Sequence, residues 1–362
     1  MSDDRRPTLA TVAARAAVSR QTVSNALNAP HLVHPETLER VLGAVAELGY
    51  RPHGAARQLR TRRSGVVGLR LEPTADGISG AVLDRFLHSV TEQAQLRGYR
   101  VMLFTAADDD AEIDQYGELV DVLGVDAFVL TSTHHGDPRT RWLSASDVPF
   151  VTFGRPWATT SADDRDPADV ADHAWVDVDG AVGTRAAVEH LLDLGHRRIA
   201  FIGWPSGSDV GDDRRRGWER AMRAAGATGD EELDRLSISV VDGVGTGVLA
   251  AERLLSRAQP TAFVCASDSL ALGALSASRT LAAAASGDQP AVVGFDDTPV
   301  ARAVGLSSVA QPLTEAAGRA FELLLAQLTD QHRAGGEPAD RAVLLNPRLV
   351  VRDSSAHRRP PT

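Results

Sequence analysis

Residues 8–28, TLATVAARAAVSRQTVSNALN, have the pattern of two short amphipathic helices joined by a tight turn. Apolar residues recur at three- and four-residue spacing in each half of the segment. Thr8 and Ser19 stand before the two helices, and both residue types cap a helix by accepting a backbone N–H. The opposite face of the second helix is polar and carries Arg20, Gln21, Ser24, Asn25 and Asn28.

That polar face indicates a recognition helix for the major groove of DNA. Arginine, glutamine and asparagine form paired hydrogen bonds with the edges of guanine and adenine. A helix-turn-helix places its second helix in the groove, and the start of its first helix, at Thr8 and Leu9, can face a phosphate. A small helical bundle with a solvated outer face has the same spacing, so helix spacing alone leaves both interpretations open.

A third helix is expected to begin after His34, because Pro35, Glu36 and Thr37 are typical of a helix start. Its pattern ends before Gly49 and Pro52, which are stop signals. Three short helices can close around a small apolar core, so we expect an all-α unit at residues 1–52.

The runs TLATVAARAAVSRQTVSNALN and VHPETLERVLGAVAELGYRPHGAARQL resemble, without a gap, the headpiece of the lactose-repressor (LacI) family of bacterial transcriptional regulators. In that family the first two residues of the recognition helix and a later one select the base sequence, and they match Arg20, Gln21 and Asn25. Asn25 stands where the family often has arginine, so the operator sequence is not predicted. The resemblance implies that further DNA contacts come from Thr8, Leu9, Ser19, Ser24, Asn28, Thr37 and Tyr50.

Residues 53–64 follow as a segment of at most two helical turns from His53, too short to be stable alone in water. The family resemblance makes it the hinge helix, which pairs with its dimer mate in the minor groove. The matching apolar wedge is Leu59, and wedges of this kind kink DNA. His53, Ala56 and Arg57 are expected beside it. The alternative is a flexible arginine-rich linker.

Charge is divided unevenly along the chain. The net charge is -10, but residues 1–64 hold ten arginines against five acids, which gives +5 there and leaves -15 for the remainder. A basic arm on an acidic body concentrates phosphate attraction at one end. Cys265, the single cysteine, excludes an intrachain disulfide. With no apolar run of membrane length and a charged start, we expect a cytoplasmic, nucleoid-associated protein.

From Gly65 onward, short apolar runs alternate with helical patterns in two successive sets. Continuous apolar strands separated by helices predict parallel sheets covered on both faces. We therefore expect an α/β core of two doubly wound parallel-sheet lobes, with a ligand cleft beyond the carboxyl ends of the strands. The expected boundaries are 65–176 with 310–330 for the first lobe, 177–309 with 331–352 for the second, and a tail at 353–362.

The segments GHRRIAFIGWP, DDRRRGW, ASDSLALGAL and VVGFDD resemble the periplasmic-binding-protein-like core of the same family. That match assigns effector contacts to Arg214, Ser267 and Asp296. Arg155 and His134 follow first-lobe strands and are further candidates, and Trp204 offers an aromatic face. Carboxylate and guanidinium groups bond vicinal hydroxyls in pairs, and an aromatic ring covers the apolar side of a sugar. The expected effector is therefore a small sugar or glycoside.

Signatures of other functions are missing from the sequence. It has no nucleophile elbow and no P-loop, and the neighbouring His134 and His135 lack the spacing of a metal site. We therefore expect no catalytic residue, no metal and no cofactor. The C-terminal residues contain no leucine heptads, so a homodimer is the simplest assembly.

These observations predict a repressor that binds a near-palindromic operator as a homodimer, with DNA affinity controlled by a small molecule between the lobes. The effector favours one lobe arrangement and thereby changes how the hinge segments meet DNA. A nucleobase- or nucleoside-responsive regulator and a free sugar-binding protein remain alternatives. The sequence leaves open whether the effector induces or co-represses.

Overall fold

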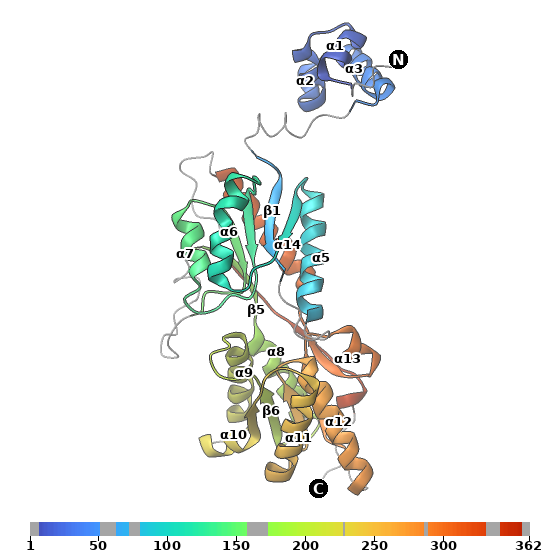
Figure 1. Cartoon of the computed structure of the whole chain (residues 1–362). Helices are drawn as coiled ribbons and strands as arrows, with labels where there is room; N and C mark the ends of the chain where they lie inside the picture. The colour runs from blue at the N-terminus through green and yellow to red at the C-terminus, as the bar shows by residue number, and fades with distance from the viewer. Residues whose placement is uncertain are drawn as a thin grey trace. The chain divides into compact units, whose positions relative to one another are not determined.

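The computed structural model describes residues 7–50, 63–71, 80–157, 173–226, 229–285, 289–330 and 341–356. The chain divides into two compact units, residues 1–65 and residues 66–362, each with its own core (Figure 1). Below, the smaller unit is called the headpiece and the larger one the core.

The headpiece is built from helices α1 (Leu9–Ala16), α2 (Arg20–Asn28) and α3 (Pro35–Leu48), with a 3-10 turn at Pro30–Leu32. Its helix ends are set by local chemistry. Thr8 and Ser19 cap α1 and α2 by accepting backbone N–H groups three residues on. Ala17 and Gly49 end α1 and α3 in the left-handed region, at φ 53° and 60°. The three helices close over a core that includes Val12, Val23 and Val41, each with 0% exposure.

The first lobe of the core contains a six-stranded sheet in the order β11-β5-β4-β3-β1-β2. All of its described pairings are parallel. Helices α5 and α14 contribute to the apolar cluster on one face, and α6 and α7 to the cluster on the other. The strands and helices are β1 (Val66–Arg70), β2 (Arg100–Phe104), β3 (Ala127–Leu130), β4 (Phe150–Phe153), β5 (Ala174–Val178), β11 (Ala342–Leu345), α5 (Gly80–Leu96), α6 (Asp109–Asp121), α7 (Pro138–Ala145) and α14 (Leu313–Asp330).

The second lobe contains a second six-stranded sheet, in the order β12-β10-β9-β8-β6-β7. Its described pairings are parallel except that β12 runs antiparallel to β10. Its elements are α8 (Gly180–Asp193), β6 (Ile199–Gly203), α9 (Val210–Ala224), α10 (Asp230–Leu236), β7 (Ser237–Ser239), α11 (Val244–Ala258), β8 (Ala262–Cys265), α12 (Asp268–Ala285), β9 (Ala291–Phe295), α13 (Pro299–Ala303), β10 (Ser307–Ala310), β12 (Arg348–Val350) and a 3-10 turn at Asp353–Ser355.

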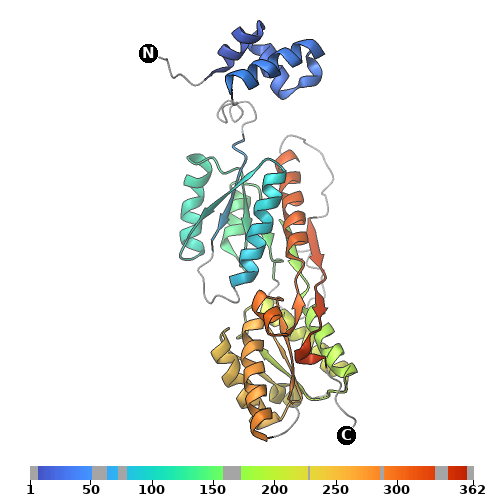
Figure 2. The same cartoon turned by 90° about the vertical axis from the view of Figure 1, so that its right-hand side faces the viewer.

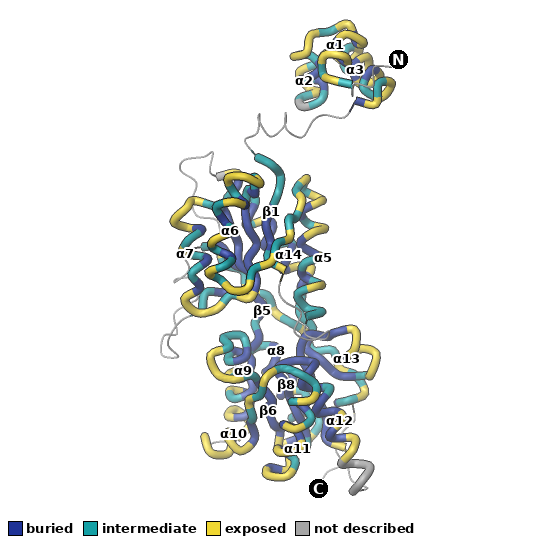
Figure 3. Tube along the Cα trace, in the orientation of Figure 1, coloured by how far each residue is buried: buried dark blue, intermediate teal, exposed yellow. Residues whose placement is uncertain are grey.

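Burial follows the layered arrangement in both lobes. The central strands are buried, while the outer sides of the covering helices are exposed (Figure 3). In the rotated view, α14 lies beside α5 on the same side of the first sheet (Figure 2). These features confirm the predicted fold class, a helix-turn-helix unit followed by two doubly wound lobes.

The C-terminal segment departs from the predicted division between the lobes. Residues 331–352 were expected wholly in the second lobe, but β11 pairs with β5 in the first sheet and only β12 joins the second. Pro347 lies between these strands and has no N–H for a ladder bond, so the ladder ends there and the chain changes lobe. The expected tail also begins later, because Ser354 donates to the Val292 carbonyl and Ser355 is buried.

Candidate functional site

The outer face of α2 is the candidate DNA surface of the headpiece. Val23 and Ala26 are buried in the core, which turns the opposite side of the helix outward. Arg20 and Gln21 are exposed there, and Asn25 is half-buried beside them. The Gln21 Nε2 donates to Asn25 Oδ1 at 3.0 Å, so the residues predicted to read bases lie together on one surface.

The other predicted headpiece contacts divide into surface and core positions. Thr8 and Ser19 are exposed at the starts of α1 and α2, whereas Leu9 and Thr37 are half-buried and Leu9 packs against the core. Tyr50 has 7% exposure and belongs to the core itself. Tyr50 therefore packs in the core, and its predicted DNA contact stays a prediction.

Some predicted contacts lie outside the described residues. They are His53, Ala56, Arg57 and Leu59 of the expected hinge, and the side chain of Asn28. Ser24 is half-buried on α2, next to Asn25.

The two lobes meet at the carboxyl ends of their strands. Among the described residues, polar contacts join the end of the first sheet to the end of the second. They include Arg155 Nη2 to Asp213 Oδ2 at 3.2 Å, the His135 N–H to Asp209 Oδ2 at 2.8 Å, and Arg85 Nη1 to the Asp296 carbonyl at 3.5 Å. Ligands of open α/β sheets bind beyond these strand ends. The facing ends of the lobes are therefore where an effector site is expected.

Arg214 is the centre of the second-lobe cluster. It is 5% exposed, its Nη2 lies 3.5 Å from Asp296 Oδ1, and its guanidinium carbon lies 3.7 Å from the centroid of the Phe295 ring. Gln311 Nε2 donates to the same Asp296 oxygen at 2.7 Å. Burial raises the pKa of Asp296, and the Arg214 guanidinium opposes that rise. Among the described residues, the buried Arg214 Nε has no hydrogen-bond partner, so one donor is left for an acceptor from outside the chain.

Asp242 organises the other second-lobe residues, and the sequence analysis missed it. Trp204 Nε1 donates to Asp242 Oδ1 at 2.9 Å, and the Ser267 hydroxyl donates to the same oxygen. The Arg214 guanidinium carbon lies 5.2 Å from the Trp204 ring centroid, and Arg214 Nη1 donates to the Ala266 carbonyl, next to Ser267. The structure thus brings Arg214, Ser267, Asp296 and Trp204 together. The available signal for Asp242 was its position just after β7, at a strand end.

Asp268, next to Ser267, is hydrogen-bonded to the loop that follows β9 and to β10 in the second lobe. Its carboxylate accepts the Ser308 hydroxyl at 2.6 Å and the Thr298 N–H at 2.7 Å. Burial, together with the nearby Asp296, raises the pKa of Asp268 to about 7, against the effect of these hydrogen bonds. Asp268 therefore joins α12 to the β9–β10 loops of the second lobe.

Arg155, predicted to contact the effector, is used inside the protein. It is 9% exposed, its Nε donates to Asp177 Oδ2 at 2.5 Å, and its Nη2 donates to Asp213 across the lobes. Its guanidinium carbon lies 4.8 Å from the Trp157 ring centroid. Burial disfavours its charge, but Asp177 and Asp213 outweigh burial and raise the pKa of Arg155. The structure assigns this side chain to bridging the lobes.

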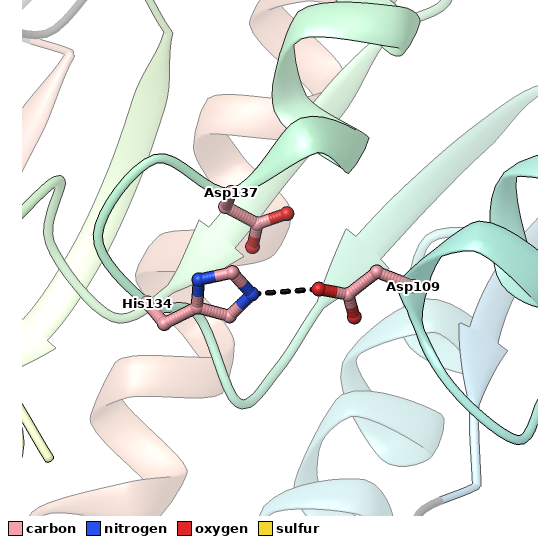
Figure 4. A group of neighbouring side chains, drawn as sticks. All are labelled: Asp109, His134 and Asp137. Atoms are coloured by element: carbon pink, nitrogen blue, oxygen red, sulfur yellow. Dashed lines mark hydrogen bonds and ion pairs between the residues drawn. The ribbon is translucent and has the colours of Figure 1, made fainter.

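His134 lies in a separate charged group of the first lobe, at the starts of α6 and α7 (Figure 4). Its Nε2 is 2.6 Å from Asp109 Oδ2, and ligand-type atoms of Asp109, His134 and Asp137 lie within 4.8 Å of one another. Both carboxylates also pair with Arg139, at 3.4 Å and 2.7 Å. A guanidinium so close repels a metal cation. These residues therefore form a network of ion pairs and do not have the chemistry of a metal site.

In the part of the chain that the structure describes, no helix is both long and apolar enough to cross a membrane.

Comparisons with known proteins agree with this architecture. Residues 8–53 match the family model of bacterial regulatory proteins, lacI family, and residues 188–355 match the periplasmic binding protein-like domain. The HTH-type transcriptional regulator CelR of Thermobifida fusca is 36% identical over 98% of this chain and 100% of its own length.

Two solved structures are similar over nearly the whole chain. A transcriptional regulator CelR–cellobiose complex is 32% identical, with a TM-score of 0.66 over 96% of this chain and 100% of that one. The lac repressor dimer bound to operator and the anti-inducer ONPF has a TM-score of 0.73 over 97% of this chain and 99% of that one, and at 24% identity it shows the fold alone. The protein described here belongs to the LacI family of bacterial transcriptional regulators, which are not enzymes.

Proposed function

We propose that this regulator is a repressor that binds a near-palindromic operator as a homodimer and responds to a small sugar or glycoside held between the lobes. The observation that carries the effector part is the second-lobe cluster. It combines a buried guanidinium with an unpaired donor atom, a carboxylate and an indole, which is a set suited to sugar hydroxyls and a sugar face. The CelR–cellobiose complex, 32% identical, supports the same class of ligand.

The proposed division of labour follows the two units. The headpiece at 1–52 places Arg20, Gln21 and Asn25 against base edges, and the helix starts at Thr8 and Ser19 against phosphates. The hinge at 53–64 transmits the lobe arrangement to the headpiece. A regulator of chromosomal operators works in the bacterial cytoplasm at the nucleoid, and we include this location in the proposal.

A homodimer is supported by apolar side chains exposed at the edges of the sheets, including Leu344 (41%) on β11 and Val351 (46%) next to β12. β2 and β7 are terminal strands of the two sheets. Large apolar residues on or next to these edges are exposed: Leu71 (44%), Leu96 (78%), Leu103 (46%), Val241 (71%) and Leu249 (67%). A second copy of the chain would cover them, and two headpieces would then read two half-sites. Sedimentation equilibrium should give a dimer at micromolar concentrations, and a monomer with full operator affinity would contradict this part.

The effector is tested by calorimetric titration of the full-length protein with cellobiose, a panel of other sugars, and a purine panel. Arg214→Ala should weaken sugar binding at least tenfold, because charge-assisted hydrogen bonds are worth about 1.5–3 kcal/mol. Arg220→Ala, at an exposed position on the same helix, is the matched control and should bind normally. Binding of purines in place of sugars would overturn the proposed effector class.

A further inference from the structure

A charged cluster in the first lobe is largely buried and is not used by the effector site. It comprises Arg70, Asp109, Glu112, His134, Asp137 and Arg139. Arg139 and Glu112 are 1% and 2% exposed, and Arg139 Nη1 donates to Glu112 Oε2 at 3.0 Å. Arg70 Nη1 donates to the same oxygen at 2.8 Å, and the Tyr116 hydroxyl donates to Glu112 Oε1 at 2.8 Å. The cluster therefore joins β1, α6 and α7 through Glu112.

The ring of His134 has an acceptor at each nitrogen. Nε2 lies 2.6 Å from a carboxylate oxygen of Asp109, and Nδ1 lies 3.0 Å from the carbonyl oxygen of His135. An ionised carboxylate and a carbonyl only accept hydrogen bonds, so both ring nitrogens must carry hydrogen for both contacts to form. With both contacts formed, His134 is in the imidazolium form.

The charge balance of the cluster favours the same form. Three carboxylates, those of Asp109, Glu112 and Asp137, face the two guanidinium groups of Arg70 and Arg139. One more positive charge makes the cluster neutral, and the His134 imidazolium supplies it. An unbalanced charge is costly beside Arg139 and Glu112, which are 1% and 2% exposed, and the His134 ring, 46% exposed, lies at the outer edge of the cluster. A proton on His134 therefore completes the cluster without a metal ion.

The His134 ring also contacts the residue that reaches the other lobe. Its Nδ1 holds the His135 carbonyl, in the peptide that follows His135, while the His135 N–H, in the peptide that precedes it, donates to Asp209 Oδ2 at 2.8 Å in the second lobe. The loop between β3 and α7 has left-handed backbone at Ser132 and Gly136, with φ 53° and 69°. Such a loop depends on side-chain anchors for its conformation. His134 is one of the anchors of this loop, together with Arg139, whose Nη2 donates to the Thr131 and Ser132 carbonyls, and His135 itself, whose Nδ1 lies 2.7 Å from the Trp157 carbonyl.

We propose that His134 is a positioning residue whose charged form holds the His135 amide against Asp209, so that closure of the two lobes takes up a proton. For effector binding this inference rests on the proposed function, but the proton-dependent closure needs no ligand. The groups that face His134 and its loop come from every packed element: Asp109 and Glu112 on α6, Arg70 on β1, Asp137 and Arg139 at α7, Asp209 before α9, and His135 itself.

The direction of the pH dependence follows from the contact with Asp109. That hydrogen bond raises the pKa of His134 above 6.5, and the His135 carbonyl contributes in the same direction, while burial opposes the rise. The stabilising contact is thus complete below about pH 6.5, the ordinary pKa of histidine, and is lost as the pH rises through the higher folded-state pKa. Closed lobes are expected at low pH and partly open lobes at high pH.

The test is energy transfer between two dyes on the full-length, ligand-free protein, measured from pH 6 to pH 9. Cysteines are introduced by Ser144→Cys in the first lobe and Glu232→Cys in the second, both exposed positions. Cys265 is buried, and burial raises its thiol pKa, so it stays unlabelled. We expect transfer to fall with a single midpoint above pH 6.5. The fall is partial, because the Arg155 bridge between the lobes remains.

Three variants decide whether His134 causes that midpoint. His134→Gln, which cannot titrate, should remove it, and Asp209→Ala should give, at every pH, the reduced transfer that wild type shows at high pH. His88→Gln is the matched control, because His88 forms an exposed pair with Asp84 at 3.5 Å in the same lobe, and it should behave as wild type. A flat wild-type profile, or a midpoint kept in His134→Gln, would overturn the proposal. Restoration of closure at pH 9 by added zinc, or its loss in chelator at pH 6, would overturn it in favour of a metal.

Cellobiose titrations at the same pH values separate this inference from the proposed function. If cellobiose binds the closed form, its affinity should fall by up to about tenfold per pH unit above the midpoint in wild type, and should lose that dependence in His134→Gln. Failure of every sugar to bind would count against the proposed effector and would leave the ligand-free transfer experiment to decide the role of His134.

Discussion

The facing ends of the two lobes carry similar residue types but use them differently. In the first lobe, Arg155 and Arg139 are each held by two or more carboxylates of the protein. In the second lobe, Arg214 has one carboxylate partner at 3.5 Å, two aromatic rings beside it and a buried Nε with no partner among the described residues. Paired cations build structure, whereas incompletely paired ones can receive a ligand. For these arginines, the difference favours a structural role in the first lobe and supports the proposed recognition role in the second, although Thr133 Oγ1 and Trp157 Nε1 of the first lobe are also buried without a partner among the described residues.

The largest expected effect tests the structural half of this comparison. Arg139→Leu leaves the buried Asp137 without its guanidinium partner and Glu112 with only Arg70 and Tyr116, which should lower the free energy of unfolding by about 3–5 kcal/mol. Urea denaturation followed by circular dichroism measures the loss. Arg141→Leu, at an exposed position on the same helix, should change stability by less than about 0.5 kcal/mol. Equal, small losses in both variants would mean that the first-lobe network is not structural.

The next expected effect is a pH dependence of stability, caused by the buried carboxylate of Asp268 beside the second-lobe cluster. Since burial raises the pKa of Asp268 to about 7, above its usual 3.8, the folded state binds this proton more tightly than the unfolded state. Its contribution to stability is complete below about pH 3.8 and is lost as the pH rises through about 7. The loss is on the order of 4 kcal/mol by the usual 1.36 kcal/mol per pKa unit.

Urea denaturation of wild type and Asp268→Asn across pH 4 to 8 measures this loss of unfolding free energy. The difference in unfolding free energy between the two proteins should shift against wild type as the pH rises, because the amide does not ionise. A difference that is constant with pH would show that Asp268 is ionised throughout.

The smallest effect concerns the organisation of the recognition cluster. Asp242→Ala removes the acceptor shared by Trp204 and Ser267, and should weaken cellobiose binding about 30-fold, or roughly 2 kcal/mol. Titration calorimetry measures the change, with Asp230→Ala as an exposed acidic control. An unchanged affinity in Asp242→Ala would break the comparison, since recognition would then not depend on the second-lobe cluster.

Features set by neighbouring residues were predictable from the sequence. The caps at Thr8 and Ser19 and the polar face of α2 depend on residues within one or two helical turns, and the structure shows them as expected. The apolar runs at the middle of each sheet likewise became buried strands, because continuous apolar segments between helices suit sheets covered on both faces, whereas the edge strands β2 and β7 are only partly buried.

Features set by distant pairing were not predictable. β11 joined the first sheet through its edge with β5, more than 160 positions earlier, and no local pattern carries that information. Asp242 meets partners 25 and 38 positions away. Arg155 has the residue type of a ligand contact, but Asp177 and Asp213 determine its role, and their positions depend on the folded lobes.

The central claim is that α2 reads DNA under the control of a small molecule in the core. The most direct measurement is fluorescence anisotropy of the full-length protein on duplexes selected from a randomised pool, with and without cellobiose. The account predicts selection of two symmetric half-sites, an affinity that changes when cellobiose is added, and losses of about 10- to 100-fold for Arg20→Ala and Gln21→Ala. Selection of no sequence, or binding unaffected by these substitutions and by every sugar tested, would contradict it.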